Sequence, residues 1–154
     1  MNVKAIPSGY SSVTPYLIVE GATEAIEFYK QVFGATERMR LPLPGGKIAH
    51  AEIQIGDSVV MLADQPTGPT AGRSKSPTAL DGTAVSIHLY IEDVDSVMEK
   101  ATKAGAQQVR AVANQFYGDR SGIFTDPFGH VWNVATHIED LSPEEMEKRM
   151  AELS

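Results

Sequence analysis

The hydrophobic pattern of the first 63 residues predicts a strand, a helix and three further strands. A run rich in β-branched and aromatic residues covers 13–19, and residues 22–33 carry apolar side chains at helical spacing. Gly34 suits the C-terminus of that helix. Short strands are expected near 37–41, 50–55 and 58–62, separated by turn-forming residues. This part of the chain therefore predicts one βαβββ unit.

The same plan recurs 72 residues later. A strand is expected over 85–91 and a helix over 94–104 that ends at Gly105. Further strands are expected near 107–112, 121–125 and 130–136, with Asp126-Pro127-Phe128-Gly129 as the last turn. A period this long indicates one supersecondary unit used twice, and two such halves usually leave a cleft where ligands bind. The prediction is a single α+β domain of two tandem units, about 12–63 and 84–137.

Two segments fall outside the repeat. Residues 64–83 hold three prolines and three glycines, which predicts either a solvated linker or a functional lid. Residues 142–153 predict a C-terminal helix, with Ser142 as its cap and Pro143 at its first position. Its narrow apolar stripe predicts either docking on the body or on a second subunit, or a frayed end.

Composition excludes several classes of function. The 154 residues carry 13 basic and 20 acidic side chains, a net charge of −7, which does not fit a nucleic-acid-binding protein. No apolar run approaches the length of a membrane span, and the first residues lack a signal-peptide core. The absence of cysteine excludes disulfides and thiolate chemistry. We expect a soluble cytoplasmic protein that binds neither membranes nor nucleic acids.

Two motifs carry a family resemblance. The segment Ala25-Ile26-Glu27-Phe28-Tyr29 to Gly34 and the turn before His130, within a doubled βαβββ plan, resemble the vicinal oxygen chelate superfamily. This group includes glyoxalase I, bleomycin-resistance proteins and extradiol dioxygenases. The stretch 117–122 is most similar to its PhnB-like and glyoxalase-like members. The resemblance covers about residues 12–137 and implies a homodimer. The segment 64–83 is long enough to let the two chains of such a dimer exchange whole units.

The resemblance also implies four metal-binding positions. Family enzymes hold a divalent metal with His, Gln or Glu from the first and last strands of each unit. Here these positions fall on Thr14, Met61, Ser86 and Asn133. A divalent cation requires imidazole nitrogens or carboxylate oxygens, which hydroxyl, thioether and amide groups do not replace. We therefore expect no metal and no other cofactor.

Strand alternation places other side chains beside these positions. The candidates for ligand binding are Tyr16, His50, Glu52, Met61, Ser86, His88, Tyr90, Phe116, Arg120 and Asn133. His88 is either a proton donor or ligand partner, or a satisfied structural histidine. His50, Glu52 and His88 are an alternative set of ligands for a displaced divalent metal. Arg120 either closes over a ligand with Phe116 or forms a hydrogen-bonded turn with Asp119.

Two functions fit these residues. The favoured one is a metal-independent binding protein that sequesters a small molecule, as bleomycin-resistance proteins do. The alternative is a lyase, isomerase or dioxygenase-like enzyme that uses the displaced metal, or His88 in acid–base catalysis. The sequence identifies neither the ligand nor a reaction.

Overall fold

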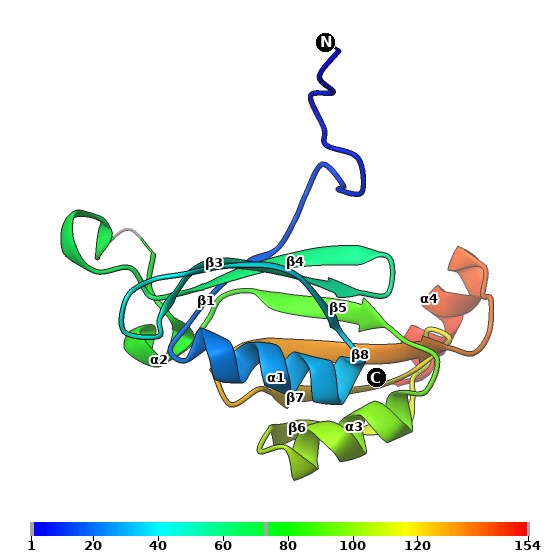
Figure 1. The fold of residues 1–154 in the computed structure, drawn as a ribbon. Helices are drawn as coiled ribbons and strands as arrows, with labels where there is room; N and C mark the ends of the chain where they lie inside the picture. The colour runs from blue at the N-terminus through cyan, green and yellow to red at the C-terminus, as the bar shows by residue number, and fades with distance from the viewer. Residues whose placement is uncertain (1, 73, 154) are drawn as a thin grey trace. The chain divides into compact units, whose positions relative to one another are not determined.

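Two four-stranded mixed sheets, each with a helix on one face, confirm the duplicated α+β plan in the computed structural model (Figure 1). The structure describes residues 2–72 and 74–153. It divides into unit 1, Met1–Ala84 with Pro127–His130, and unit 2, Val85–Asp126 with Val131–Ser154. Each unit is described by itself.

Unit 1 contains a sheet with the strand order β1-β4-β3-β2. Strand β1 runs parallel to β4, and the other neighbours are antiparallel. Helix α1 packs on β2, β3 and β4. The elements are β1 Tyr16–Val19, α1 Ala22–Phe33, β2 Thr36–Pro42, β3 Ile48–Ile55 and β4 Ser58–Asp64.

Unit 2 repeats this order as β5-β8-β7-β6, with β5 parallel to β8 and helix α3 packed on β6, β7 and β8. A C-terminal helix, α4, follows the sheet. The elements are β5 Ser86–Tyr90, α3 Val94–Lys103, β6 Gln107–Asn114, β7 Asp119–Thr125, β8 Val131–His137 and α4 Pro143–Glu152.

Strand alternation separates the buried from the more exposed side chains of the unit 1 sheet. Leu17 and Val19 on β1 are buried, as are Ala51, Ile53 and Ile55 on β3. These residues form the core side of the unit 1 sheet because alternate strand residues share a face. The opposite face, which we call the polar face, carries Tyr16 of β1 and His50, Glu52 and Gln54 of β3.

The predicted linker holds more structure than the sequence indicates. A 3₁₀ turn, η1, covers Gly68–Thr70, and a short helix, α2, covers Pro77–Leu80. Ser76 is fully buried and its hydroxyl accepts the backbone N–H of Ala79, so it caps α2. Residue 73, inside the predicted linker, lies outside the described residues.

The turn at 127–130 packs within unit 1. The ring of Phe128 lies 6.2 Å from that of Phe28 on α1, in an edge-to-face arrangement. The Nε2 atom of His130 lies 2.9 Å from the carbonyl oxygen of Ile18. The His130 ring therefore contacts the backbone of β1 within unit 1.

Helix α4 begins as predicted. The Ser142 hydroxyl accepts the backbone N–H of Glu145. Arg149 on α4 lies 2.6 Å from a Glu139 carboxylate oxygen and donates to the Phe116 carbonyl oxygen at 3.2 Å. Polar contacts therefore hold α4 to unit 2, while Met150 on the same helix is exposed. In the described part of the chain, none of the helices has both the length and the apolar character needed to cross a bilayer.

Candidate functional site

A buried carboxylate, Glu52, organises the polar face of the unit 1 sheet. Glu52 lies on β3 and is 5% exposed. Its Oε1 atom accepts a hydrogen bond from the Tyr10 hydroxyl, and its Oε2 atom lies 2.8 Å from Nε2 of His50. The other ring nitrogen of His50, Nδ1, lies 2.7 Å from the hydroxyl oxygen of Tyr16 on β1. We call Tyr10, Glu52, His50 and Tyr16 the unit 1 relay.

The relay keeps Glu52 ionised and Tyr16 protonated. Burial by itself would raise the pKa of Glu52, but the hydrogen bonds from Tyr10 and His50 and the nearby charge of Arg38 outweigh it, so this pKa lies below its ordinary value. The pKa of Tyr16 is raised, first by burial and second by the charge of Glu52. At neutral pH the relay therefore contains a carboxylate and an intact phenol.

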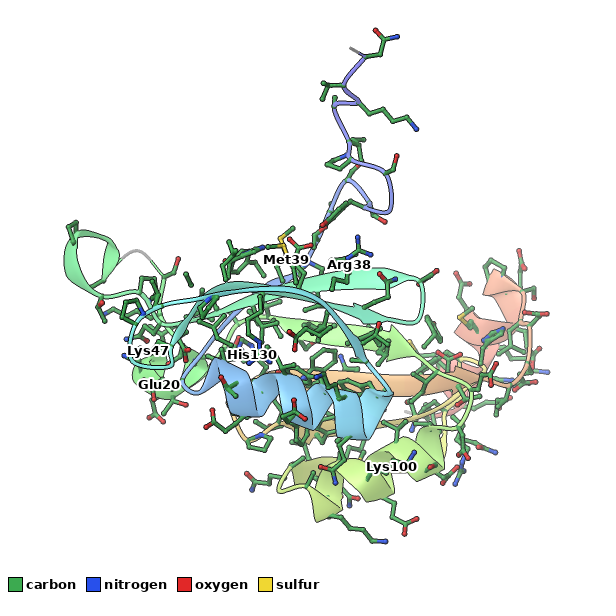
Figure 2. The ribbon with its side chains drawn as sticks, viewed as in Figure 1. Glu20, Arg38, Met39, Lys47, Lys100 and His130 are labelled. Carbon is green, nitrogen blue, oxygen red and sulfur yellow. The ribbon has the colours of Figure 1, made fainter. Side chains whose placement is uncertain are left out.

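A β-bulge brings Arg38 to this carboxylate. On β2, Glu37 pairs with Ile53 and Met39 with Glu52, so Arg38 is the extra residue between them. Its guanidinium carbon lies 5.0 Å from the centre of the Tyr10 ring, and its Nε lies 4.0 Å from Oε1 of Glu52. Figure 2 shows Arg38 beside Met39 on β2. The bulge thus directs a cation to the buried end of the relay.

A pocket of about 670 Å³ opens in unit 1 at the other end of the relay, where Tyr16 forms part of its wall. This volume suits a small molecule. Lys47, at the turn between β2 and β3, contributes a cationic side chain (Figure 2). Among the apolar residues of the wall are Ile18, Leu43, Ile48, Ala49, Ala63 and Pro66.

Asp64, at the end of β4, fixes one side of this pocket. Its Oδ1 accepts the backbone N–H groups of Gly21 and Ala22, each at 2.9 Å, and its Oδ2 accepts that of Ile48 at 2.8 Å. Gly21 precedes α1 and has no side chain that could cap it. Asp64 therefore caps α1 from a neighbouring strand and ties it to β3.

The polar face of unit 2 brings together the sequence candidates of β5 and β8. The side-chain amide of Asn133 donates to the Ser86 hydroxyl at 3.0 Å. The His88 and Tyr90 rings lie 4.8 Å apart, nearly edge to face. His88 is exposed, so it is a surface side chain of unit 2.

A second carboxylate network lies beside Tyr90. The Tyr90 hydroxyl donates to the buried Asp119 at 3.2 Å, and Nδ1 of His137 lies 2.8 Å from the same carboxylate. Nε2 of His137 lies 2.7 Å from Asp140. Hydrogen bonds to Asp119 and then to Asp140 raise the pKa of His137. This network resembles the unit 1 relay, because each contains a tyrosine, a buried carboxylate and a histidine.

Arg120 and Asp119 point in different directions. The guanidinium of Arg120 makes two 2.8 Å contacts with Asp95 on α3 and one of 3.1 Å with Asn114. Asp119 faces Tyr90 instead, so the alternative of a hydrogen-bonded Asp119–Arg120 turn is wrong. Strand alternation explains the difference, because both residues belong to β7 rather than to a loop. Phe116, before β7, packs its ring edge to face against Tyr117 at 5.2 Å.

In each unit the first strand pairs with the last, and the register shows which residues lie opposite one another. Tyr16 lies opposite Met61, and His88 lies opposite Asn133. The two pairs are 72 residues apart in the sequence, as predicted. Tyr16 and His88, however, take the places predicted for Thr14 and Ser86, which lie two residues earlier. Thr14 precedes β1.

Neither pair of strand positions fits a divalent metal. The unit 1 pair offers a phenol and a thioether, and the unit 2 pair offers one imidazole and an amide. Both oxygens of Glu52 and both ring nitrogens of His50 already have partners in the relay. Over residues 2–72 and 74–153, no three His, Asp or Glu side chains form a group that could hold a metal ion.

Three contributors to these sites were not identified from the sequence. Tyr10 lies in the segment before β1, where no periodic pattern marks it. Arg38 reaches Glu52 because of a bulge in β2. Asp64 is, in the sequence, only the first residue of the predicted linker. The proline- and glycine-rich sequence after Asp64 indicates that a strand ends at this residue, but not that its side chain caps a helix.

Comparisons with known proteins agree with this architecture. A model of the glyoxalase/bleomycin resistance protein/dioxygenase superfamily matches residues 11–134. An uncharacterized protein of Mycobacterium bovis is 40% identical over 140 residues, which are 91% of this chain and 92% of that protein. The solved structure of the PhnB protein from Bacillus cereus has a TM-score of 0.64 and 18% identity, and covers 82% of this chain and 99% of its own. The fosfomycin resistance protein FosX from Mesorhizobium loti has a TM-score of 0.59 and 19% identity, with 82% and 91% covered. At these identities the two structures show the fold alone.

Proposed function

The chain belongs to the glyoxalase/bleomycin resistance protein/dioxygenase superfamily, and we propose that within it the chain is a metal-independent small-molecule binding protein. The ligand, an antibiotic or a metabolite with an apolar body, enters the unit 1 pocket and is sequestered there. The observation that carries this proposal is the unit 1 relay, since the basic atoms of His50 and Glu52 are used to hold one another and Tyr16.

The character of the pocket supports binding rather than metal chemistry. Its wall combines apolar side chains with a few residues that carry polar groups, among them Tyr16 and Lys47. Small-molecule sites have this composition, because apolar area supplies affinity and a few polar groups fix orientation. Fosfomycin resistance in FosX makes an antibiotic one candidate ligand, although the likeness to FosX is one of fold.

The protein is proposed to act as a homodimer, as its family membership implies. Exposed apolar side chains of unit 2 are compatible with an interface, including Val85, Val109 and Met150.

Filling the pocket tests the proposal. Ala49 is exposed on β3 and lines the pocket, so Ala49→Phe adds a ring to the pocket without enlarging a core residue. We expect this variant to weaken binding of planar aromatic fragments such as indole by about tenfold or more, the equivalent of roughly 1.4 kcal/mol. Saturation-transfer NMR in excess EDTA measures the binding.

Ala113→Phe is the matched control, because Ala113 is an exposed alanine on β6 of unit 2. It should leave fragment binding unchanged. The proposal fails if no fragment binds in EDTA, or if both variants bind as the wild type does. Fragment binding that requires a divalent metal and is lost in His88→Ala would instead support the alternative function, an enzyme with a displaced metal site.

A further inference from the structure

Tyr16 is the member of the unit 1 relay that reaches the pocket wall. Tyr16 is 47% exposed, and its ring lies 5.4 Å from that of His50 at an angle of 43°. Tyr16 therefore belongs both to the pocket wall and, through its hydroxyl, to the relay. Whether the Tyr16 hydroxyl acts as a hydrogen-bond donor or acceptor toward a ligand depends on the direction of its O–H bond.

The direction of that proton follows from Glu52. A carboxylate only accepts hydrogen bonds, so the Nε2 atom of His50, 2.8 Å away, must carry a proton. In the neutral imidazole Nδ1 then has no proton and can only accept. Beside a neutral His50, the Tyr16 hydroxyl, 2.7 Å from Nδ1, therefore donates a hydrogen bond to that nitrogen.

A phenol has one proton to donate. With that proton directed to His50, the Tyr16 oxygen retains lone pairs that can accept from a ligand. We propose that Tyr16 acts as a hydrogen-bond acceptor in the unit 1 pocket, and that the pocket selects apolar ligands carrying an N–H or O–H donor. The inference rests on the proposed function, because it names the ligand class of the same pocket.

Neighbouring groups keep this arrangement in place. Tyr10 donates to the second oxygen of Glu52, and Arg38 lies 4.0 Å from that oxygen, so the carboxylate stays ionised and oriented. The raised pKa of Tyr16 means that the phenol keeps its proton at neutral pH. Glu52 thus selects the neutral form of His50 that carries its proton on Nε2.

The tautomer can be observed without any ligand. Long-range ¹H–¹⁵N NMR distinguishes the protonated ring nitrogen of a neutral histidine from the unprotonated one. The chain has four histidines, so the His50 signals can be assigned by their loss in His50→Gln. At about pH 8, where histidine is ordinarily neutral, we expect the proton on Nε2. A proton on Nδ1 would overturn the inference.

Ligand selection is tested with two probes of the same shape. Indole has an N–H donor, and benzofuran has an ether oxygen in its place. In the wild type, indole should bind about 3-fold to 10-fold more tightly than benzofuran, the range that one net hydrogen bond gives. In Tyr16→Phe this ratio should fall to about 1, because the acceptor is gone. Tyr117→Phe, which removes a hydroxyl in unit 2, should keep the wild-type ratio.

The outcomes separate this inference from the proposed function. Equal binding of indole and benzofuran to the wild type refutes the selection of donors while leaving the pocket as a binding site. The same holds if Tyr16→Phe preserves the preference for indole. Failure of both probes to bind contradicts the proposed function itself, and the inference with it.

Discussion

Replacement of Gly118 by alanine should destabilise the protein by roughly 4 kcal/mol, with a fall in Tm of about 10 °C. Gly118 lies before β7 with a φ of +96°, a conformation that costs a residue with a Cβ about 1–2 kcal/mol. An added Cβ would also lie 2.4 Å from the backbone oxygen of Glu139. Overpacking of this kind costs a further ~1–3 kcal/mol.

The backbone around Gly118 has little freedom to relieve the clash. The Gly118 carbonyl oxygen accepts the N–H groups of Ile138 at 2.9 Å and Glu139 at 3.1 Å. Moving the chain apart would break these bonds and displace Glu139 from Arg149 on α4. The loss should therefore appear in thermal and urea unfolding of the whole chain.

Gly45→Ala is the matched control for this substitution. Gly45 has a similar φ of +88°, but an added Cβ there meets no atom within 4 Å. We expect a loss of only about 1–2 kcal/mol, the cost of the backbone conformation. Equal destabilisation by the two variants would show that the contact with Glu139 does not matter.

Asp64→Ala is expected to cost about 3 kcal/mol. The substitution leaves the N–H groups of Gly21, Ala22 and Ile48 without their acceptor. Each hydrogen bond to a charged group contributes about 1 kcal/mol or more. Loss of the cap should also loosen the start of α1, and hydrogen exchange at Ala22 would report it.

Asp93→Ala provides a graded comparison. Asp93 caps α3 through one bond, to the backbone N–H of Ser96 at 3.1 Å, in an exposed position. Loss of a single cap of this kind costs about 1 kcal/mol. Urea unfolding that ranks Asp93→Ala as equal to or more damaging than Asp64→Ala would contradict the role assigned to Asp64.

The sequence predicts the repeated fold because alternation and helical spacing are local signals. The burial of Leu17, Val19 and Trp132 follows from parity along each strand. The 72-residue repeat adds an internal check, since the two units must share one plan. The strand order and both parallel pairs are those of the doubled βαβββ unit.

The site is less predictable because its contacts depend on register and irregular backbone. A shift of two residues in the pairing of β1 with β4 exchanges Thr14 for Tyr16 opposite Met61. A bulge at Arg38 supplies a cation that strict alternation would direct elsewhere. Tyr10 reaches Glu52 across 42 residues, a separation for which the sequence carries no local signal.

The short helix α2 shows a related limit. Its cap, Ser76, and its first residue, Pro77, are the usual helix-start pair, but they stand within a proline- and glycine-rich segment. Burial of Ser76, and the bond from its backbone N–H to Gln65, come from tertiary packing rather than from composition.

Native mass spectrometry of freshly purified protein tests the central claim most directly. We predict a homodimer that carries no divalent metal and forms a complex with indole at one molecule per chain, unchanged by EDTA. One Zn²⁺, Ni²⁺ or Fe²⁺ per chain, whose removal by EDTA also abolishes the complex, would contradict the account.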